Sequence, residues 1–214
     1  MTVEQFTDGA DAPPGTTFHD LGPILSYMAD MLVLMSTTTA HLTTQLADQL
    51  EWHWRNQLRP RLDGLTNDEY FWEPVPDCWT LHPDGTIDFE FPAPTPAPVT
   101  TIAWRLAHVI VGVLAMRAHS HFDGPPADYQ TWNYATDAAT ALRQLDTAYT
   151  DWISGVRRLS AEDLAKPIGP AEGPWADKPM LDLVLHINRE VIHHGAEIAL
   201  LRDLYIHRTD NKEN

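Results

Sequence analysis

The chain has 214 residues, 43% of them hydrophobic, which is enough for one soluble domain with a sizeable core. Its formal net charge of -16, from 30 acidic and 14 basic residues, argues against a nucleic-acid groove, because phosphate-backbone binding depends on clustered Lys and Arg. The single cysteine, Cys78, excludes an internal disulfide, and residues 1–15 lack the layout of a secretory signal, so we expect a cytoplasmic protein.

The N-terminal part predicts a mobile tail over residues 1–18 and then an extra helix over Leu21–Met35. Pro23 suits the first turn of this helix. The segment holds Asp30 and is shorter than the roughly 20 residues of a membrane span, so we expect no membrane insertion. Thr37, Thr38 and Thr39 are expected to interrupt the helix. Its apolar positions recur at helical spacing: Ile24, Leu25, Met28, Met31, Leu32 and Met35.

The next periodic run predicts the first long helix, which we expect to end before Pro60. Thr66-Asn67-Asp68-Glu69 matches a capping box and predicts a short helix through Trp72. The periodic positions of the long helix are Leu42, Leu46, Leu50, Trp54 and Leu58.

Residues 73–99 contain seven prolines and predict one long, non-helical crossover. Within it, Trp79–His82 and Thr86–Phe89 flank Pro83-Asp84-Gly85, a pattern typical of a small β-hairpin. A connection of this length is usually functional, so we expect it to border the site.

Three more long helices are predicted, over Thr101–Phe122, over 137–158 and from Pro179 to about Tyr205, with a short capped turn at Ser160–Asp163. These elements predict an all-α fold, a four-helix bundle with one long Pro-rich crossover and an extra N-terminal helix. We expect a single domain over residues 19–206 and a C-terminal tail over 207–214. The buried face of the 137–158 helix is expected to carry Leu142, Leu145, Tyr149, Trp152, Ile153 and Val156.

The last helix carries an unusual polar ridge among apolar neighbours. His186, Glu190, His194 and Glu197 follow one another at steps of four, four and three, which places them about one turn apart on one face. Burying such groups unpaired costs several kcal/mol, so the ridge indicates either a solvated face or a metal site. The flanking apolar residues favour the metal site.

Imidazole and carboxylate suit zinc, nickel, iron or manganese, and two groups four apart on a helix can reach one ion. His108 is the strongest candidate for a third ligand, because it lies in the middle of an apolar helix. A lone histidine in such a position is more often a hydrogen-bonded core residue than a metal ligand. Only the ridge on the last helix makes His108 a stronger candidate for a ligand. Glu190 with His193 matches the Glu-x-x-His of di-iron bundles, but no second copy is present, so a mononuclear site is preferred. The spacing also excludes H-E-x-x-H of metalloproteases.

Residues 101–108, Thr-Ile-Ala-Trp-Arg-Leu-Ala-His, together with Glu190-Val-Ile-His-His194-Gly-Ala-Glu, resemble the DinB-like superfamily of metal-binding four-helix bundles. That superfamily includes mycothiol-dependent maleylpyruvate isomerase and the bacillithiol S-transferases. Most members carry His-x-x-x-His on the last helix, and the isomerase branch carries Glu-x-x-x-His, as here. The resemblance covers about residues 40–205. It implies His108, Glu190 and His194 as metal ligands, with His193 beside them.

Three protein ligands would leave one open position, as in catalytic zinc sites. A thiol bound there would be deprotonated, so our hypothesis is a low-molecular-weight-thiol-dependent S-transferase or isomerase that uses a thiol such as mycothiol and an electrophilic substrate. A metal-dependent hydrolase using bound water and a non-catalytic metal-binding stress-response protein are the alternatives.

Other polar residues are candidates for orienting the ligands or binding substrate. His186 and Glu197 would orient ligands, and an arginine would hold a carboxylate of thiol or substrate, although each arginine is individually more often a surface ion pair. The apolar surfaces of Leu21–Met35 and of the crossover could support a homodimer. The candidates are His193, His186, Glu197, His53 with Gln57, Arg117, Arg189 and Arg202.

Overall fold

The computed structural model describes the backbone of residues 21–208 and the side chains of residues 25–29 and 41–208. It divides into two compact units, Met1–Thr39 and Ala40–Asn214. The expected tail over residues 1–18, and residues 209–214 of the expected C-terminal tail, lie outside the described residues. The domain limits at residues 19 and 206 stay predictions.

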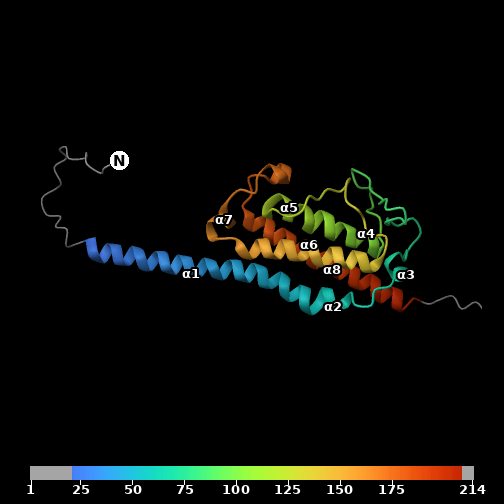
Figure 1. Ribbon diagram of the computed structural model, residues 1–214, viewed down its shortest axis with the longest axis horizontal. Helices are drawn as coiled ribbons and strands as arrows, with labels where there is room; N and C mark the ends of the chain where they lie inside the picture. Colours follow the sequence, from blue (N-terminus) through green and yellow to red (C-terminus); the bar gives the residue numbers. More distant parts are fainter. Residues whose placement is uncertain (1–20, 209–214) are drawn as a thin grey trace, which may run out of the picture. The chain divides into compact units, whose positions relative to one another are not determined.

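The fold is all-α, as predicted, and residues 21–208 contain no β-strand. Four long helical stretches form the bundle: the end of α1 with η2 and α2, the α4–η3–α5 stretch, α6, and α8 (Figure 1). The elements are α1 (Leu21–His53), η2 (Trp54–Leu58), α2 (Arg59–Arg61), α3 (Asn67–Tyr70), α4 (Ile102–Ala107), η3 (His108–Ala115), α5 (Met116–Phe122), α6 (Ala138–Arg158), α7 (Ala161–Ala165), η4 (Pro170–Trp175) and α8 (Met180–Ile206).

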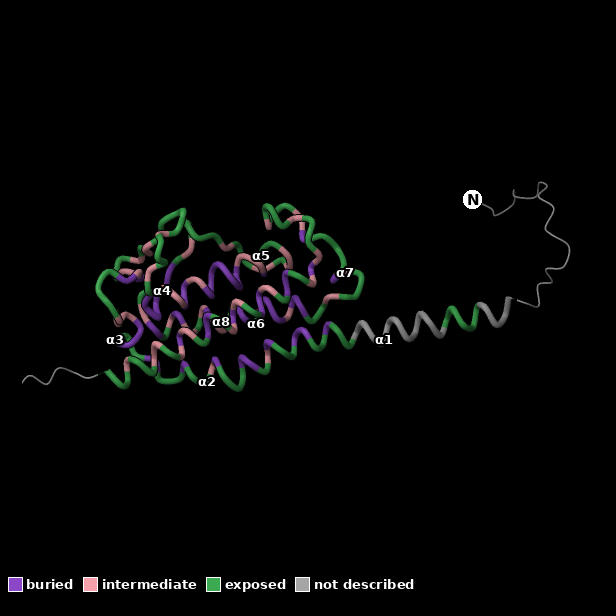
Figure 2. The backbone as a smooth tube through the Cα atoms, turned by 180° about the vertical axis from the view of Figure 1, so that it is seen from behind, coloured by how far each residue is buried: buried purple, intermediate pink, exposed green. Residues whose placement is uncertain are grey.

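The core lies where these stretches face one another, and Figure 2 shows buried backbone along α4, α6 and α8. On α6, Leu145 and Trp152 are fully buried, and Leu142 is half-buried. Tyr149 stacks on Trp54 of η2 with the ring centroids 3.9 Å apart. The predicted apolar face of this helix is therefore the face that joins it to its neighbours.

The expected break at Thr37, Thr38 and Thr39 is wrong, because α1 is helical from Leu21 to His53. Threonine costs only about 0.7 kcal/mol or less per residue relative to alanine, which is too little to end a long helix. Leu25 and Met28 of the predicted apolar stripe are exposed, and the other four stripe side chains lie outside the described ones.

The helical path also continues past Pro60, which we expected to lie beyond its end. At η2 the turn widens from α to π, so that the amide of Arg59 donates to the Trp54 carbonyl. Pro60 then stands in the first turn of α2, where a missing N–H is tolerated.

One of the two helix caps read from the sequence is complete. Ser160 and Asp163 form the reciprocal capping box of α7. At α3, Thr66 Oγ1 accepts the amide of Glu69, but the Glu69 carboxylate binds Arg202 instead of the cap. The predicted capping box at Thr66 is therefore half wrong, because a distant guanidinium competes for its carboxylate.

The Pro-rich crossover turns back on itself at Pro83–Gly85, as the predicted hairpin does. The amide of Gly85 donates to the His82 carbonyl over 2.9 Å, and Gly85 has a φ of +85°, which suits glycine. Pairing is limited to an isolated bridge between Leu81 and Ile87, so neither arm is a strand.

Within residues 21–208, one stretch, Ile102–Phe122, is long and apolar enough to cross a membrane. About two thirds of its most apolar window, 67%, is buried inside the bundle. Such burial is typical of the core helix of a soluble protein.

Candidate metal centre

The polar ridge of α8 forms as predicted, and each of its members contacts the next. His186 Nδ1 lies 3.5 Å from Glu190 Oε1, and Glu190 Oε2 lies 3.4 Å from His194 Nε2. His194 Nδ1 is 2.7 Å from Glu197 Oε2, a hydrogen-bond distance. The buried imidazole of His194 therefore has a carboxylate on each side.

His108 approaches this ridge from the opposite helix. It is the first residue of η3, where the α turn of α4 gives way to a π turn, a distortion that often marks functional sites. Its ring centroid lies 4.8 Å from that of His194, with the rings nearly perpendicular. Two histidines 86 positions apart in the sequence are thus brought together by the packing of α4 and η3 on α8.

Burial, aided by the nearby His194 and Arg105, lowers the pKa of His108 from 6.5 to about 4. The imidazole is therefore neutral at physiological pH, as a metal ligand must be. Trp104 stacks on one face of the His108 ring at 5.6 Å, and the hydroxyl of Tyr129 lies 3.4 Å from Nδ1. The site offers a cation a neutral ring whose orientation is fixed.

Arg105 and Glu197 support the far side of His194. Arg105 Nε lies 3.0 Å from Glu197 Oε2, and its Nη1 is 3.4 Å from His194 Nδ1. Although burial opposes ionisation, the hydrogen bond from His194 and the charge of Arg105 hold the pKa of Glu197 below its ordinary value. Glu197 accepts a hydrogen bond from Nδ1–H of His194, and in that tautomer Nε2 is the ring nitrogen that can bind a metal.

Two sets of donors share His194. The more compact set is His193, His194 and Glu197, whose donor atoms lie within 4.8 Å of one another. The predicted set uses His194 Nε2 with Glu190 and His108. Ligands bound at 2.0–2.1 Å in a tetrahedral site stand about 3.3 Å apart, close to the 3.4 Å between His194 Nε2 and Glu190 Oε2.

Electrostatics favours the predicted set over the compact one. Arg105 lies against Glu197 and His194 Nδ1, so a divalent cation on that side would face a guanidinium at close range. His193 is also largely exposed, with 64% of its side chain accessible. On the Nε2 side, Arg189 lies 3.4 Å from the outer oxygen of Glu190, Oε1, while Oε2 faces His194 and stays available to a metal.

The structure places the remaining predicted residues at different distances from this centre. His53 is buried, bonds Gln57 through Nδ1 over 2.8 Å, and leaves Nε2 without a partner beside Gly195.

The three predicted arginines all have protein partners. Arg189 contacts His186 and Glu190. Arg117 binds Glu172 and the Gly112 carbonyl. Arg202 is two turns of α8 beyond His194 and binds Glu69 instead of the site.

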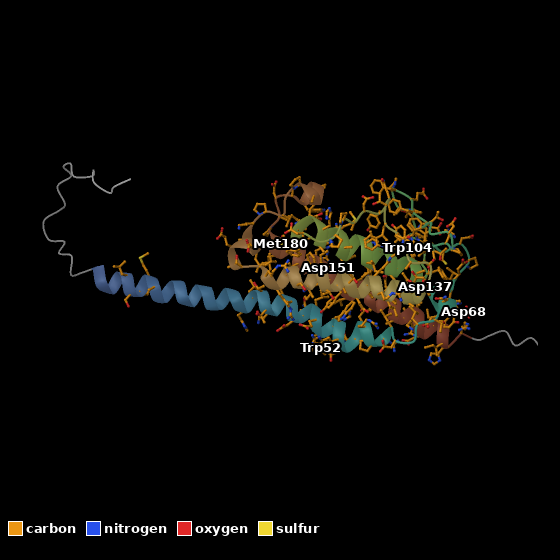
Figure 3. The ribbon with its side chains drawn as sticks, viewed as in Figure 1. Trp52, Asp68, Trp104, Asp137, Asp151 and Met180 are labelled. Atoms are coloured by element: carbon orange, nitrogen blue, oxygen red, sulfur yellow. The ribbon has the colours of Figure 1, made fainter. Side chains whose placement is uncertain are left out.

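Sequence reasoning missed Trp104, Arg105 and Tyr129. Trp104 and Arg105 stand one turn before His108, so helical spacing could have found them. Tyr129 lies in an irregular link with no periodic signal, and it fits only because Gly112 is small: a Cβ there would lie 1.5 Å from its hydroxyl. The crossover does border the site, since Trp104, marked in Figure 3, donates to the Asp88 carbonyl over 2.7 Å.

The lowered pKa of His108 predicts a pH-dependent stability of the metal-free protein. The contribution of His108 to the free energy of unfolding is fully present above its unfolded pKa of 6.5. It is lost as the pH falls from 6.5 through the folded pKa of about 4, and the total loss is about 3 kcal/mol. Urea unfolding at pH 7.5, 5.5 and 4.5 measures this. His108→Gln, which does not titrate, should show a correspondingly smaller loss, and parallel curves for the two proteins would contradict the assignment.

Comparison with known proteins supports the same region. A family model described as the DinB superfamily matches residues 49–198, which include His53, His108, Glu190 and His194. No curated protein and no solved structure matches the chain.

Proposed function

Because the chain belongs to the DinB superfamily, we propose that it binds one divalent metal ion, zinc in the simplest case, through His108, Glu190 and His194. Nickel, iron and manganese accept the same donors. The observation that carries the proposal is the 3.4 Å approach of Glu190 Oε2 to His194 Nε2, with the His108 ring beside them.

We further propose that the site is catalytic and acts on a low-molecular-weight thiol such as mycothiol. Three protein donors leave a coordination position for a small molecule. A metal ion held there would lower the pKa of a bound thiol or water. In the proposed reaction the thiolate attacks an electrophilic carbon: for an unsaturated carbonyl, the S–C bond forms, the C=C electron pair moves to the adjacent carbon, and that carbon takes a proton.

The residues around the donors prepare the site for this reaction. Glu197 holds the proton of His194 on Nδ1, and Arg105 balances the charge of Glu197. Trp104 and Tyr129 contact the His108 ring and hold its orientation. A homodimer and a cytoplasmic location complete the proposal, on the basis of the exposed Leu25, Tyr27 and Met28 and of the single unpaired cysteine.

A thiol-consumption assay tests the reaction. The zinc-loaded protein is mixed with a thiol and a panel of electrophiles, including α,β-unsaturated acids, and compared with His108→Ala. We expect thiol-dependent turnover that falls at least a hundredfold in the variant. Turnover of esters or amides without thiol would assign a hydrolase, and no turnover by a fully zinc-loaded protein would assign a non-catalytic metal-binding protein.

A further inference from the structure

A second concave site adjoins the candidate metal centre. A cavity of about 380 Å³ lies between α5, the link that carries η4, and the first half of α8. The η4 link lies near α5 at one end of the bundle (Figure 1). The cavity is lined by Arg117, Ile168, Glu172, Trp175, Lys178, Asp182, Leu183, His186 and Arg189.

The cavity gathers positive charge in a strongly acidic chain. Arg117, Lys178 and Arg189 are three of only 14 basic residues, in a chain whose net charge is -16. Lys178 makes no ion pair with any described side chain, and Arg117 Nε is buried without a hydrogen-bond partner. Lys178 therefore retains its donors for a ligand, whereas the Arg117 Nε is enclosed by protein.

The cavity also holds two acidic residues, and the more buried of them, Glu172, pairs with Arg117 and not with Lys178. Glu172, whose side chain is only 8% exposed, already binds Arg117 at 3.3 Å and His121 at 2.9 Å. The hydrogen bond from His121 lowers the pKa of Glu172, and the charge of Arg117 adds to this effect. Burial acts in the opposite direction but is outweighed. Glu172 thus ties the η4 link to α5, while Asp182 is exposed at the start of α8.

Two residues that line the cavity contact Glu190 of the candidate metal centre. Arg189 Nη2 and His186 Nδ1, from two residues that line the cavity, lie 3.4 and 3.5 Å from Glu190 Oε1. The other oxygen, Oε2, faces His194. The cavity and the candidate metal centre are therefore linked through the two oxygens of Glu190.

We propose that this cavity binds the carboxylate of a small organic acid and so defines the substrate class of the neighbouring centre. Arg117 and Lys178 hold the carboxylate, and Trp175, Ile168 and Leu183 contact the apolar part of the molecule. A carboxylate matches the planar fork of a guanidinium, and the cavity has the volume of an ordinary small-ligand site. This inference rests on the proposed function for the identity of the reacting end, but binding itself requires no metal.

Calorimetric titration tests the proposal with 3-phenylpropionate as the probe, and with 3-phenylpropanamide and inorganic phosphate as comparisons. We expect 3-phenylpropionate to bind the metal-free protein, with Kd raised about tenfold by Lys178→Met and by Arg117→Met. Lys166→Met, which removes a lysine paired with Asp163 outside the cavity, should leave Kd unchanged. Circular dichroism checks that each variant is folded, and Lys178, being exposed, carries the test if Arg117→Met unfolds.

Three results would overturn the carboxylate assignment: tighter binding of phosphate, equal binding of the uncharged amide, or no effect of Lys178→Met. Binding that follows the expected pattern in a protein without thiol-transfer activity would uphold the cavity and reject the proposed function. Thiol transfer with neutral electrophiles only, and no 3-phenylpropionate binding, would do the reverse.

Discussion

Zinc affinity should fall more than a hundredfold in His108→Ala, Glu190→Gln and His194→Ala, and by less than tenfold in His193→Ala. Removing an orienting partner of a metal ligand typically costs 10–100-fold, so the loss of a ligand itself should exceed that range. The measurement is a competition titration of the metal-free protein against a chromophoric chelator, with elemental analysis of the purified proteins. Glu197→Gln should fall between the two groups, because it orients His194.

The comparison of His108→Ala with His193→Ala decides between the two donor sets that share His194. If the ion is held on the Nδ1 side of His194, by His193 and Glu197, then His193→Ala loses the metal and His108→Ala keeps it. That outcome would rule out His108, Glu190 and His194 as the ligand set. It would also require Arg105 to tolerate a divalent cation within its ion pair with Glu197.

The largest expected effect on stability comes from Arg202→Met, which should lower the free energy of unfolding by about 3–5 kcal/mol. Arg202 binds both oxygens of Glu69, at 2.5 and 3.0 Å, and its Nη1 binds the carbonyls of Arg61 and Asp63. The Glu69 side chain is only 4% exposed, so removing the guanidinium leaves a buried charge without its partner. Urea unfolding of the metal-free protein measures the change.

Arg61→Met is the matched control. Arg61 pairs with Asp203 on the same helix as Arg202, but both side chains are about half exposed, so the loss should be below about 1 kcal/mol. The double variant Glu69→Gln, Arg202→Met should recover part of the stability. Equal effects of Arg61→Met and Arg202→Met would show that burial of Glu69 contributes little.

The sequence by itself determined the features that depend on neighbours along one helix. The ridge of His186, Glu190, His194 and Glu197 follows from 3.6 residues per turn, and the contacts between successive members in the structure confirm it. The same periodicity predicted the all-α fold and the buried face of α6. The capping box at Ser160 was also readable, because both of its partners lie within four residues.

Only the tertiary structure decided how groups distant in sequence meet. It widened the helical turns at Trp54 and at His108, carried the helix past Pro60, and drew Glu69 away from its cap to Arg202. It also placed Arg105 behind Glu197 and gathered the cationic residues of the cavity from α5, the η4 link and α8. These outcomes depend on packing between helices. A buried ion pair such as that of Glu69 with Arg202 outweighs a helix cap worth about 1 kcal/mol. The spacing of residues along a single helix carries no information about such contacts.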